Sequence, residues 1–276
     1  MQGPDFERPP IEEVALSVQF APLRGLTTAH LARYWESVRD QFPSWREAAP
    51  IPAAVELFGA PLMATPKFEL RVEGGVVPNR ALFEGASGGE WVQVQRDRFA
   101  RNWRRREGSH EYPRFPALRA RFGDDLRAFR DFVTTSGLPD LEINQCEITY
   151  VNLLTAGEGW SQHGDVGAVI SPLSGATSDG RLPLPESVDA TFRYLFVWPG
   201  EAEPAGRLHV HVTPVHRIVD GEPMLKVVLT ARGRPRGTDV AQASSWLEVG
   251  HDFLVRAFTS LTTPTMHQRW GRRDAP

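Results

Sequence analysis

The first strong pattern in the chain is an alternation of apolar and polar residues in the stretch IEEVALSVQF. Every second residue from Val14 to Phe20 is apolar, and the residues between them are small or polar. Side chains of a strand point alternately to its two faces, so this alternation predicts a half-buried strand. The next stretch, TAHLARYWESVRDQF, has apolar residues at helical spacing and predicts a helix over Thr28–Phe42.

Similar patterns continue along the chain. The first half predicts strands around Val55–Phe58, Lys67–Val72, Arg80–Glu84 and Trp91–Phe99, and then an amphipathic helix over Phe115–Thr135. The second half predicts strands at Ile143–Leu154, Thr191–Trp198, Arg207–Val215 and Met224–Arg232, followed by a helix over Asp239–Leu261. A segment near residues 155–188, rich in Gly, Ser and Pro, is expected to be an insertion with a short helix near Gln162–Ile170.

The order strand, helix, several strands, helix therefore occurs twice. We interpret residues 1–140 and 141–276 as two α+β repeats that form one continuous, curved, mainly antiparallel sheet with its helices on one face. This arrangement resembles the TATA-binding-protein-like and helix-grip folds, in which the other face of the sheet is left open. Such a likeness concerns the fold and does not give a function.

Composition narrows the class of protein. The chain has 276 residues, a net charge of -3 and one cysteine, Cys146, which fits a reducing compartment. No apolar run is long enough for a membrane span, and the first residues, MQGPDFERPPIEE, do not have the pattern of a signal peptide. We therefore expect a cytoplasmic protein without a membrane partner. Only two of its basic residues, Lys67 and Lys226, are lysine, so the number of arginines carries little information about function.

The side of the sheet opposite the predicted core has many hydrogen-bonding groups. From the last three strands it receives Arg193, His209, His211, Thr213, Lys226, Thr230 and Arg232, and from earlier strands Gln93, Gln95, Gln145, Glu147 and Thr149. Such a face is either washed by solvent or a binding surface.

Two kinds of chemistry are open on this face. His209 and His211 point the same way on one strand and could ligate a metal, but no third ligand is evident, since Glu147, His163, Asp165 and His216 would need the fold to bring them near. An enzyme could instead use Glu147 as acid or base with His209 or His211. No phosphate loop, dinucleotide fingerprint or nucleophile elbow is present, so we expect no cofactor.

The stretch VQVQRDRFARNWRRR, Val92–Arg106, combines a strand pattern with a block of arginines. Arginines beside a tryptophan are typical of contacts to phosphates and bases. The acidic residues around the block and the net negative charge favour specific contacts by Arg98 and Arg104 over general nucleic-acid binding.

Five segments taken together suggest a family. They are PPIEEVALSVQFAPL, VQVQRDRFARNWRR, YPRF, INQCEITYVNLL and FTSLTTPTMHQRWGR, in this order along nearly the whole chain. In these segments the chain resembles an uncharacterised, sporadically distributed family of bacterial proteins of about this length. The resemblance brings no established activity, and its scattered occurrence suggests an accessory role, as in defence or toxin–antitoxin systems.

The resemblance implies a signature of Gln93, Arg98, Asn102, Trp103, Arg104, Tyr112, Pro113, Glu147, Tyr150, Asn152, His267 and Trp270. Together with His209 and His211, these residues except Tyr112 and Pro113 form the predicted binding site. We expect a binding module that recognises a protein or peptide partner or a small anionic ligand on the open sheet face, with Arg98, Asn102 and Arg104 at its rim. The alternatives are the Glu147–histidine enzyme and a nucleic-acid-binding protein that uses Arg96–Arg106. A homodimer is compatible with each of these.

Overall fold

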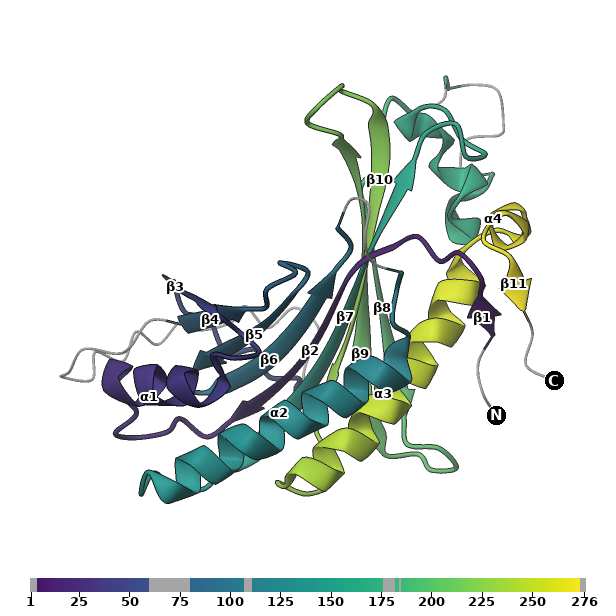
Figure 1. Cartoon of the computed structure of the whole chain (residues 1–276). Helices are drawn as coiled ribbons and strands as arrows, with labels where there is room; N and C mark the ends of the chain where they lie inside the picture. The colour runs from purple at the N-terminus through teal and green to yellow at the C-terminus, as the bar shows by residue number, and fades with distance from the viewer. Residues whose placement is uncertain (1–3, 60–79, 107–110, 176–181, 184, 274–276) are drawn as a thin grey trace.

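The computed structural model describes residues 4–59, 80–106, 111–175, 182–183 and 185–273. Within these ranges the chain is mixed α/β, and a nine-stranded sheet forms its centre with the strand order β3-β4-β5-β6-β2-β7-β10-β9-β8. Each pair of neighbouring strands in this sheet is antiparallel. Figure 1 shows the sheet with the helices α2 and α3 lying side by side across one of its faces.

The sheet strands are β2 (Ile11–Phe20), β3 (Ser44–Ala48), β4 (Arg80–Glu84), β5 (Glu90–Gln95), β6 (Arg98–Arg104), β7 (Ile143–Thr155), β8 (Ala190–Val197), β9 (Pro204–His216) and β10 (Pro223–Gly233). The α-helices are α1 (Thr28–Val38), α2 (Phe115–Thr135), α3 (Val240–Leu261) and α4 (Pro264–Arg269). Two 3-10 helices, η1 (His163–Ala168) and η2 (Ser171–Leu173), follow β7, and two short strands, β1 (Asp5–Phe6) and β11 (Arg272–Arg273), pair with each other.

The strand order divides the sheet between the two halves of the chain. The strands β2 and β7 are neighbours near its middle. Strands from the first half follow on the side of β2, and strands from the second half follow on the side of β7. Both halves therefore share one sheet and one core.

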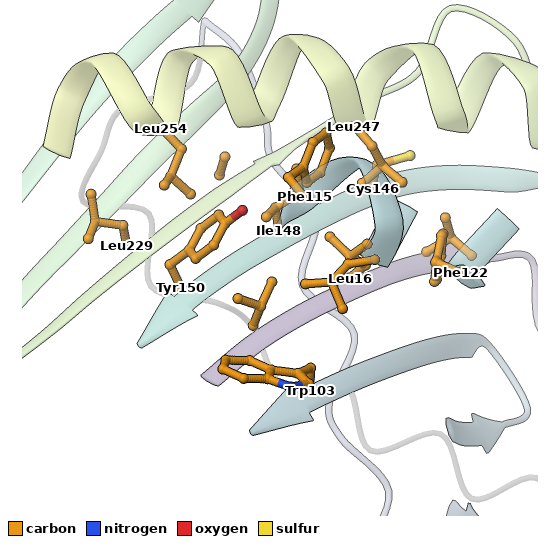
Figure 2. Packing of buried hydrophobic residues seen from close by; sticks show 14 of the residues in the cluster. Leu16, Trp103, Phe115, Phe122, Cys146, Ile148, Tyr150, Leu229, Leu247 and Leu254 are labelled. Atoms are coloured by element: carbon orange, nitrogen blue, oxygen red, sulfur yellow. The ribbon is translucent and has the colours of Figure 1, made fainter. Parts of the chain in front are cut away.

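The core lies between the sheet and its helices, on what we call the helix face. The apolar positions of the alternating patterns point there: Val14, Leu16 and Val18 of β2 are buried, as are the alternate residues of β7 and β10. Figure 2 shows Leu16, Ile148 and Leu247 packed between the strands and α3. The helix α1 joins the same layer, because Tyr34 packs on Phe129 of α2 with ring centroids 5.1 Å apart.

The close packing of α3 on β9 and β10, at Trp246, depends on two glycines. Gly206 of β9 and Gly233 of β10 are paired, and the indole of Trp246 covers this point while its Nε1 donates to the carbonyl of Ala205 over 2.8 Å. A Cβ added to Gly233 would lie 2.1 Å from the Ala205 oxygen. Only glycine fits here, because a side chain would force the strands or the helix apart.

The structure confirms a mainly antiparallel α/β arrangement and corrects several predicted bounds. Val55–Phe58 is not a strand, although it has the alternating composition of one. Trp91–Phe99 is two strands, β5 and β6, joined by a tight turn at Arg96 and Asp97. The first helix ends at Val38 rather than Phe42, and the strand predicted at Lys67–Val72 lies outside the described residues. None of the described helices has the length and hydropathy needed to cross a bilayer.

Candidate binding surface on the polar face of the sheet

The face of the sheet that points away from the helices is polar, and we call it the polar face. Alternation along the strands brings together on it the side chains of Glu13, Gln19, Gln93, Gln95, Arg98, Asn102, Arg104, Gln145, Glu147, Arg207, His209, His211 and Arg232. Several of them are buried even though none of the described α-helices covers this face (Figure 1). Gln19, Gln95 and Gln145 are 4%, 3% and 2% exposed.

What buries them is a segment of the same chain. Residues 51–58, which we call the strap, lie across the polar face and take part in no strand. The side chain of Gln95 accepts from the Ile51 amide and donates to the Ile51 carbonyl, with both distances 2.9 Å. Gln19 makes the same pair of bonds to Ala54, at 2.9 and 2.6 Å. These two glutamines thus bond only to backbone atoms of the strap, so their contacts do not depend on the strap's own side chains.

The contacts follow the order of the strands. Ile51 is held from β5, the carbonyl of Pro52 accepts from Arg98 of β6 at 3.3 Å, and Ala54 is held from β2. The amide of Glu56 then donates to Gln145 of β7 at 3.2 Å. The strap therefore crosses β5, β6, β2 and β7 in their order in the sheet, and its end reaches β10 and β9.

The side chain of Glu56 anchors that end of the strap. Its carboxylate contacts Arg207, lies 2.6 Å from Nε2 of His209, and lies 3.5 Å from Arg232. Burial raises the pKa of this carboxyl, but the hydrogen bond from His209 and the charges of His209, Arg207 and Arg232 outweigh burial and lower its pKa. Arg207, His209 and Arg232 therefore form a pocket built for an ionised carboxylate. We call it the acid pocket, after the acidic side chain that it holds.

Glu147 and Arg98 lie beside the acid pocket. Arg98 is 5% exposed, and its guanidinium is 3.8 Å from the Glu147 carboxylate. Arg232 donates to the other oxygen of Glu147, so this carboxylate balances two arginines. Burial lowers the pKa of Arg98, and its Nε has no hydrogen-bond partner among the described residues. The predicted acid or base, Glu147, is thus already engaged by cations.

The predicted rim is bonded within itself. Gln93 donates to Asn102 at 2.6 Å, and Asn102 donates to Glu13 at 2.8 Å. Arg104 also pairs with Glu13, at 2.7 Å, and its guanidinium stacks over the ring of Trp91. Of Arg98, Asn102 and Arg104, only Arg104 is well exposed, so only this residue presents its charge to solvent.

The histidines of the HVH segment have separate partners. His209 bonds to Glu56, whereas His211 lies 3.3 Å from the hydroxyl of Thr191 on β8. In the described part of the chain, no group of three His, Cys, Asp or Glu side chains is arranged to hold a metal ion. The alternation of β9 does place both histidines on the polar face.

Three other predicted site residues point to the helix face instead. Trp103 is 1% exposed and packs on Tyr112, with ring centroids 5.5 Å apart. Tyr150 bonds to the hydroxyl of Tyr112, and the Nδ2 atom of Asn152 donates to the carbonyl of Val227. Because these residues have the sheet between them and the strap, the predicted set does not form one site.

The last two predicted residues, His267 and Trp270, are buried near the end of the chain. His267 bonds to the hydroxyl of Thr262 at 2.9 Å, and Trp270 stacks on Phe258 of α3 with ring centroids 5.2 Å apart. Phe6 of β1 packs against both Phe258 and Trp270. These contacts fasten both ends of the described chain to α3.

The block of arginines is also largely paired. Arg101 points to the helix face, where it contacts Glu90 and Asp125 of α2. Arg105 donates to the carbonyl of Ile11 at 3.0 Å, and Arg106 donates to that of Gly88 at 2.7 Å. The block therefore serves mainly to connect parts of the chain.

The sequence patterns located the polar face but missed what occupies it. They placed Gln95, Gln145 and Arg232 on that face, yet the end of the strap, Val55–Phe58, was predicted as a strand, and neither Glu56 nor Arg207 was selected. The available signal was the two prolines in the stretch PIPAAVELF, because Pro52 cannot donate a hydrogen bond to a ladder.

No protein-family model matches the chain, and no curated protein matches it.

Proposed function

We propose that the protein is a non-enzymatic binding module whose polar face recognises an extended segment of a protein partner. The observation that carries this proposal is the way in which Gln19 and Gln95 each make two hydrogen bonds to the backbone of one strap residue. Backbone contacts of this kind give affinity for any extended chain, while pockets for side chains give selectivity. The strap is then the intramolecular occupant of a peptide site.

The acid pocket defines the selectivity. A partner segment that replaces the strap has to place a carboxylate where Glu56 now lies, because otherwise Arg207 and Arg232 would lose their counter-charge on a partly buried surface. The partner is therefore an extended segment with an acidic residue. A free small anion would satisfy the acid pocket but would leave the glutamine side chains without partners.

The covalent link makes the strap a strong competitor. A tethered segment meets its site at an effective concentration in the millimolar range. A partner must therefore bind tightly, or act where the strap has been displaced. While the strap is bound, the polar face is kept from binding other extended chains nonspecifically. Exposed hydrogen-bonding groups carry this risk in general.

Two alternatives have less support. An enzyme that uses Glu147 needs a carboxylate free to exchange protons, whereas Glu147 is held between Arg98 and Arg232. A nucleic-acid strip needs several guanidinium groups free to contact phosphates, whereas Arg101 is buried against Asp125, and Arg105 and Arg106, although exposed, donate to backbone carbonyls of the chain itself.

We also propose that the fold arose by duplication of a strand–helix–strands–helix unit, as in TATA-binding-protein-like folds. The central position of β2 and β7, and the similar places of α2 and α3 after the strands of each half, support this idea. Superposition of the two halves tests it, and different strand connections in the two halves would contradict it.

The binding proposal is tested by supplying the strap in trans. In a strap-replaced variant, residues 51–58 become Gly and Ser at unchanged length, and a fluorescent peptide APIPAAVELFG, the sequence of residues 49–59, is titrated into it. We expect saturable one-to-one binding by fluorescence anisotropy, and binding at least about tenfold weaker to the wild-type protein, whose site is filled.

A matched peptide with glutamine in place of the glutamate measures the acid pocket, and we expect it to bind about tenfold more weakly, since a hydrogen bond to a charged group is worth roughly 1.5–3 kcal/mol. A folded strap-replaced variant that binds neither peptide, or wild-type protein that binds as well as this variant, would contradict the proposal.

A further inference from the structure

A cavity of about 590 Å³ lies on the helix face, on the other side of the sheet from the strap. Tyr150 and Leu229 form its floor, α3 contributes Leu254, and the start of α2 contributes Phe115. Figure 2 shows these four residues gathered between the strands and α3. A volume of this size is in the range of sites for small molecules, which are usually lined by apolar side chains and a few polar groups.

The polar groups of this cavity form a connected set. The hydroxyl of Tyr150 lies 3.0 Å from that of Tyr112 and 3.1 Å from Nδ1 of His251 on α3. Stacking on Phe115, with ring centroids 3.7 Å apart, fixes the plane of the His251 imidazole. These contacts use Nδ1, and no described residue bonds to Nε2 of His251. The ring is thus held in place by its protein contacts while one nitrogen stays available.

A second polar atom is available nearby. Asn152 lines the same cavity, is 2% exposed, and uses its Nδ2 to donate to Val227. Its side-chain oxygen has no partner among the residues that the structure describes. A ligand in the cavity that donates a hydrogen bond would bond to this oxygen.

The charges around the cavity argue against an anionic ligand. Each arginine that lines it is already paired: Arg114 with Asp5 at 2.9 Å and Arg119 with Glu248 at 2.5 Å. Burial raises the pKa of Tyr112 to about 12 and lowers that of His251 to about 4, so both are neutral at pH 7. The lining carries three acidic residues, Asp5, Glu248 and Asp252, and two arginines that are already paired, so it disfavours an anionic guest, whereas a neutral guest avoids the cost of burying a charge.

Backbone strain occurs at one residue of the cavity lining, Arg114. Among the described non-glycine residues, Arg114 is the one with a positive φ, 67°. It precedes α2, and its guanidinium donates to the carbonyl of Phe6 at 2.8 Å, which ties β1 to the edge of the cavity. Strained residues of this kind concentrate at ligand sites, where the surroundings hold them in place.

We propose that this cavity binds a neutral, mostly apolar small molecule that carries a hydroxyl group. The apolar part would contact Phe115, Leu229 and Leu254, and the hydroxyl would bond to Nε2 of His251 and the side-chain oxygen of Asn152. A hydroxyl suits both atoms when Tyr150 donates to Nδ1, because His251 then carries its proton on Nε2, and the hydroxyl accepts from Nε2–H while it donates its one proton to the Asn152 oxygen. This site is independent of the strap, since the sheet separates the two.

The probe for the test is N-phenyl-1-naphthylamine, a neutral dye that becomes fluorescent in apolar sites. We expect saturable one-to-one binding to the wild-type protein and displacement by 2-naphthol. Displacement by 2-naphthoate, which is an anion at pH 7.5, should need at least about tenfold higher concentrations. No saturable binding of the dye, or equal displacement by the two naphthalenes, would overturn the proposal.

Variants locate the site. Leu254→Trp and Val255→Phe fill the cavity from α3 and should each weaken dye binding at least about tenfold. Leu195→Trp, at an exposed position on the polar face, is the matched control and should bind as the wild type does. Melting temperatures identify the variants that fold, and having two filling variants keeps the test valid if one does not. Wild-type affinity in a folded filling variant would overturn the proposal.

The hydroxyl contact is tested separately. We expect the wild-type protein to prefer 2-naphthol over 2-methoxynaphthalene by about five- to tenfold, the value of one ordinary hydrogen bond. Asn152→Leu is nearly isosteric but removes the oxygen that accepts the hydroxyl proton, so the preference should fall to about twofold or less. An unchanged preference in this variant would show that Asn152 does not accept from the ligand and would overturn the hydroxyl contact.

Discussion

The two faces of the sheet are buried by different means. On the helix face, apolar side chains such as Val18 and Val94 are buried in the core between the sheet and the helices. On the polar face, Gln19, Gln95 and Gln145 are nearly as buried, yet what covers them is the strap, held by hydrogen bonds and one carboxylate. Apolar packing is nondirectional and tolerates no water, whereas hydrogen bonds of the strap can be exchanged for those of another chain or of water. We infer that the helix face maintains the fold and that the polar face is the exchangeable surface.

The largest expected effect comes from a charge on the helix face. Val94→Asp places an unpaired carboxylate where the side chain is fully buried, so the free energy of unfolding should fall by about 3–5 kcal/mol. Denaturant titration measures this change. Val55→Asp is the matched control, because Val55 points outward from the strap and is 59% exposed, and its effect should stay within about 0.5 kcal/mol. Similar losses in the two variants would remove the distinction between the faces.

Arg98→Ala tests whether the polar face also contributes to the fold. Arg98 contacts Glu147 and the carbonyl of Pro52, so its loss should cost about 2–3 kcal/mol, less than for an isolated ion pair because Arg232 still balances Glu147. Arg104→Ala, at an exposed ion pair, should cost under about 1 kcal/mol. Thermal unfolding of both variants checks this order. A larger loss for Arg104→Ala would contradict a structural role for Arg98.

Much of the helix face could be predicted, since its pattern is local. The alternation in β2, β9 and β10 predicted which residues are buried, and the periodicity of Phe115–Thr135 predicted α2 within its observed bounds. The strap could not be predicted in this way. Val55–Phe58 was predicted as a strand, but the backbone of the strap bonds to glutamine side chains 35 to 89 residues away rather than to a neighbouring strand.

The candidate site was predicted only in part, because strand alternation is a local pattern whereas the contacts of the strap are long-range. Strand alternation placed His209, His211 and Glu147 on the polar face, because a period of two needs no knowledge of the partner strand. Tyr150 and Asn152 follow Glu147 on β7 by odd numbers of residues, so the same rule puts them on the opposite face. The acid pocket depends on the long-range approach of Glu56 to β9, for which the sequence holds no local signal.

The pH dependence of stability in Glu56→Gln tests how much the carboxylate of the polar face contributes. The pKa of Glu56 is lowered in the folded protein, so its contribution to stability is present above the ordinary carboxyl pKa of about 4.3 and is lost as pH falls through the folded value. At pH 7 the free energy of unfolding of the variant should be lower than that of the wild type by about 1–2 kcal/mol. This gap between the two proteins should narrow between about pH 5 and pH 3. Urea titrations across this range measure it. A gap that widens at low pH would contradict an ionised Glu56.

The smallest effect is expected in the arginine block. Arg105→Ala removes an exposed side chain whose bonds go to the carbonyls of Ile11 and Pro9, so its stability should change by within about 0.5 kcal/mol. The loss of stability should be measured under the same conditions as for Arg98→Ala. The two values then compare the contribution of an exposed arginine with that of a buried one.

Amide hydrogen exchange of the strap tests the central claim most directly. Ile51 and Ala54 donate to Gln95 and Gln19, so in the wild-type protein their amides should exchange at least about a hundredfold more slowly than in the free peptide APIPAAVELFG. In Gln19→Ala, the protection of Ala54 should fall while that of core amides in β7 is unchanged. Exchange of Ile51 and Ala54 in the wild-type protein at the rates of the free peptide would contradict an occupied polar face.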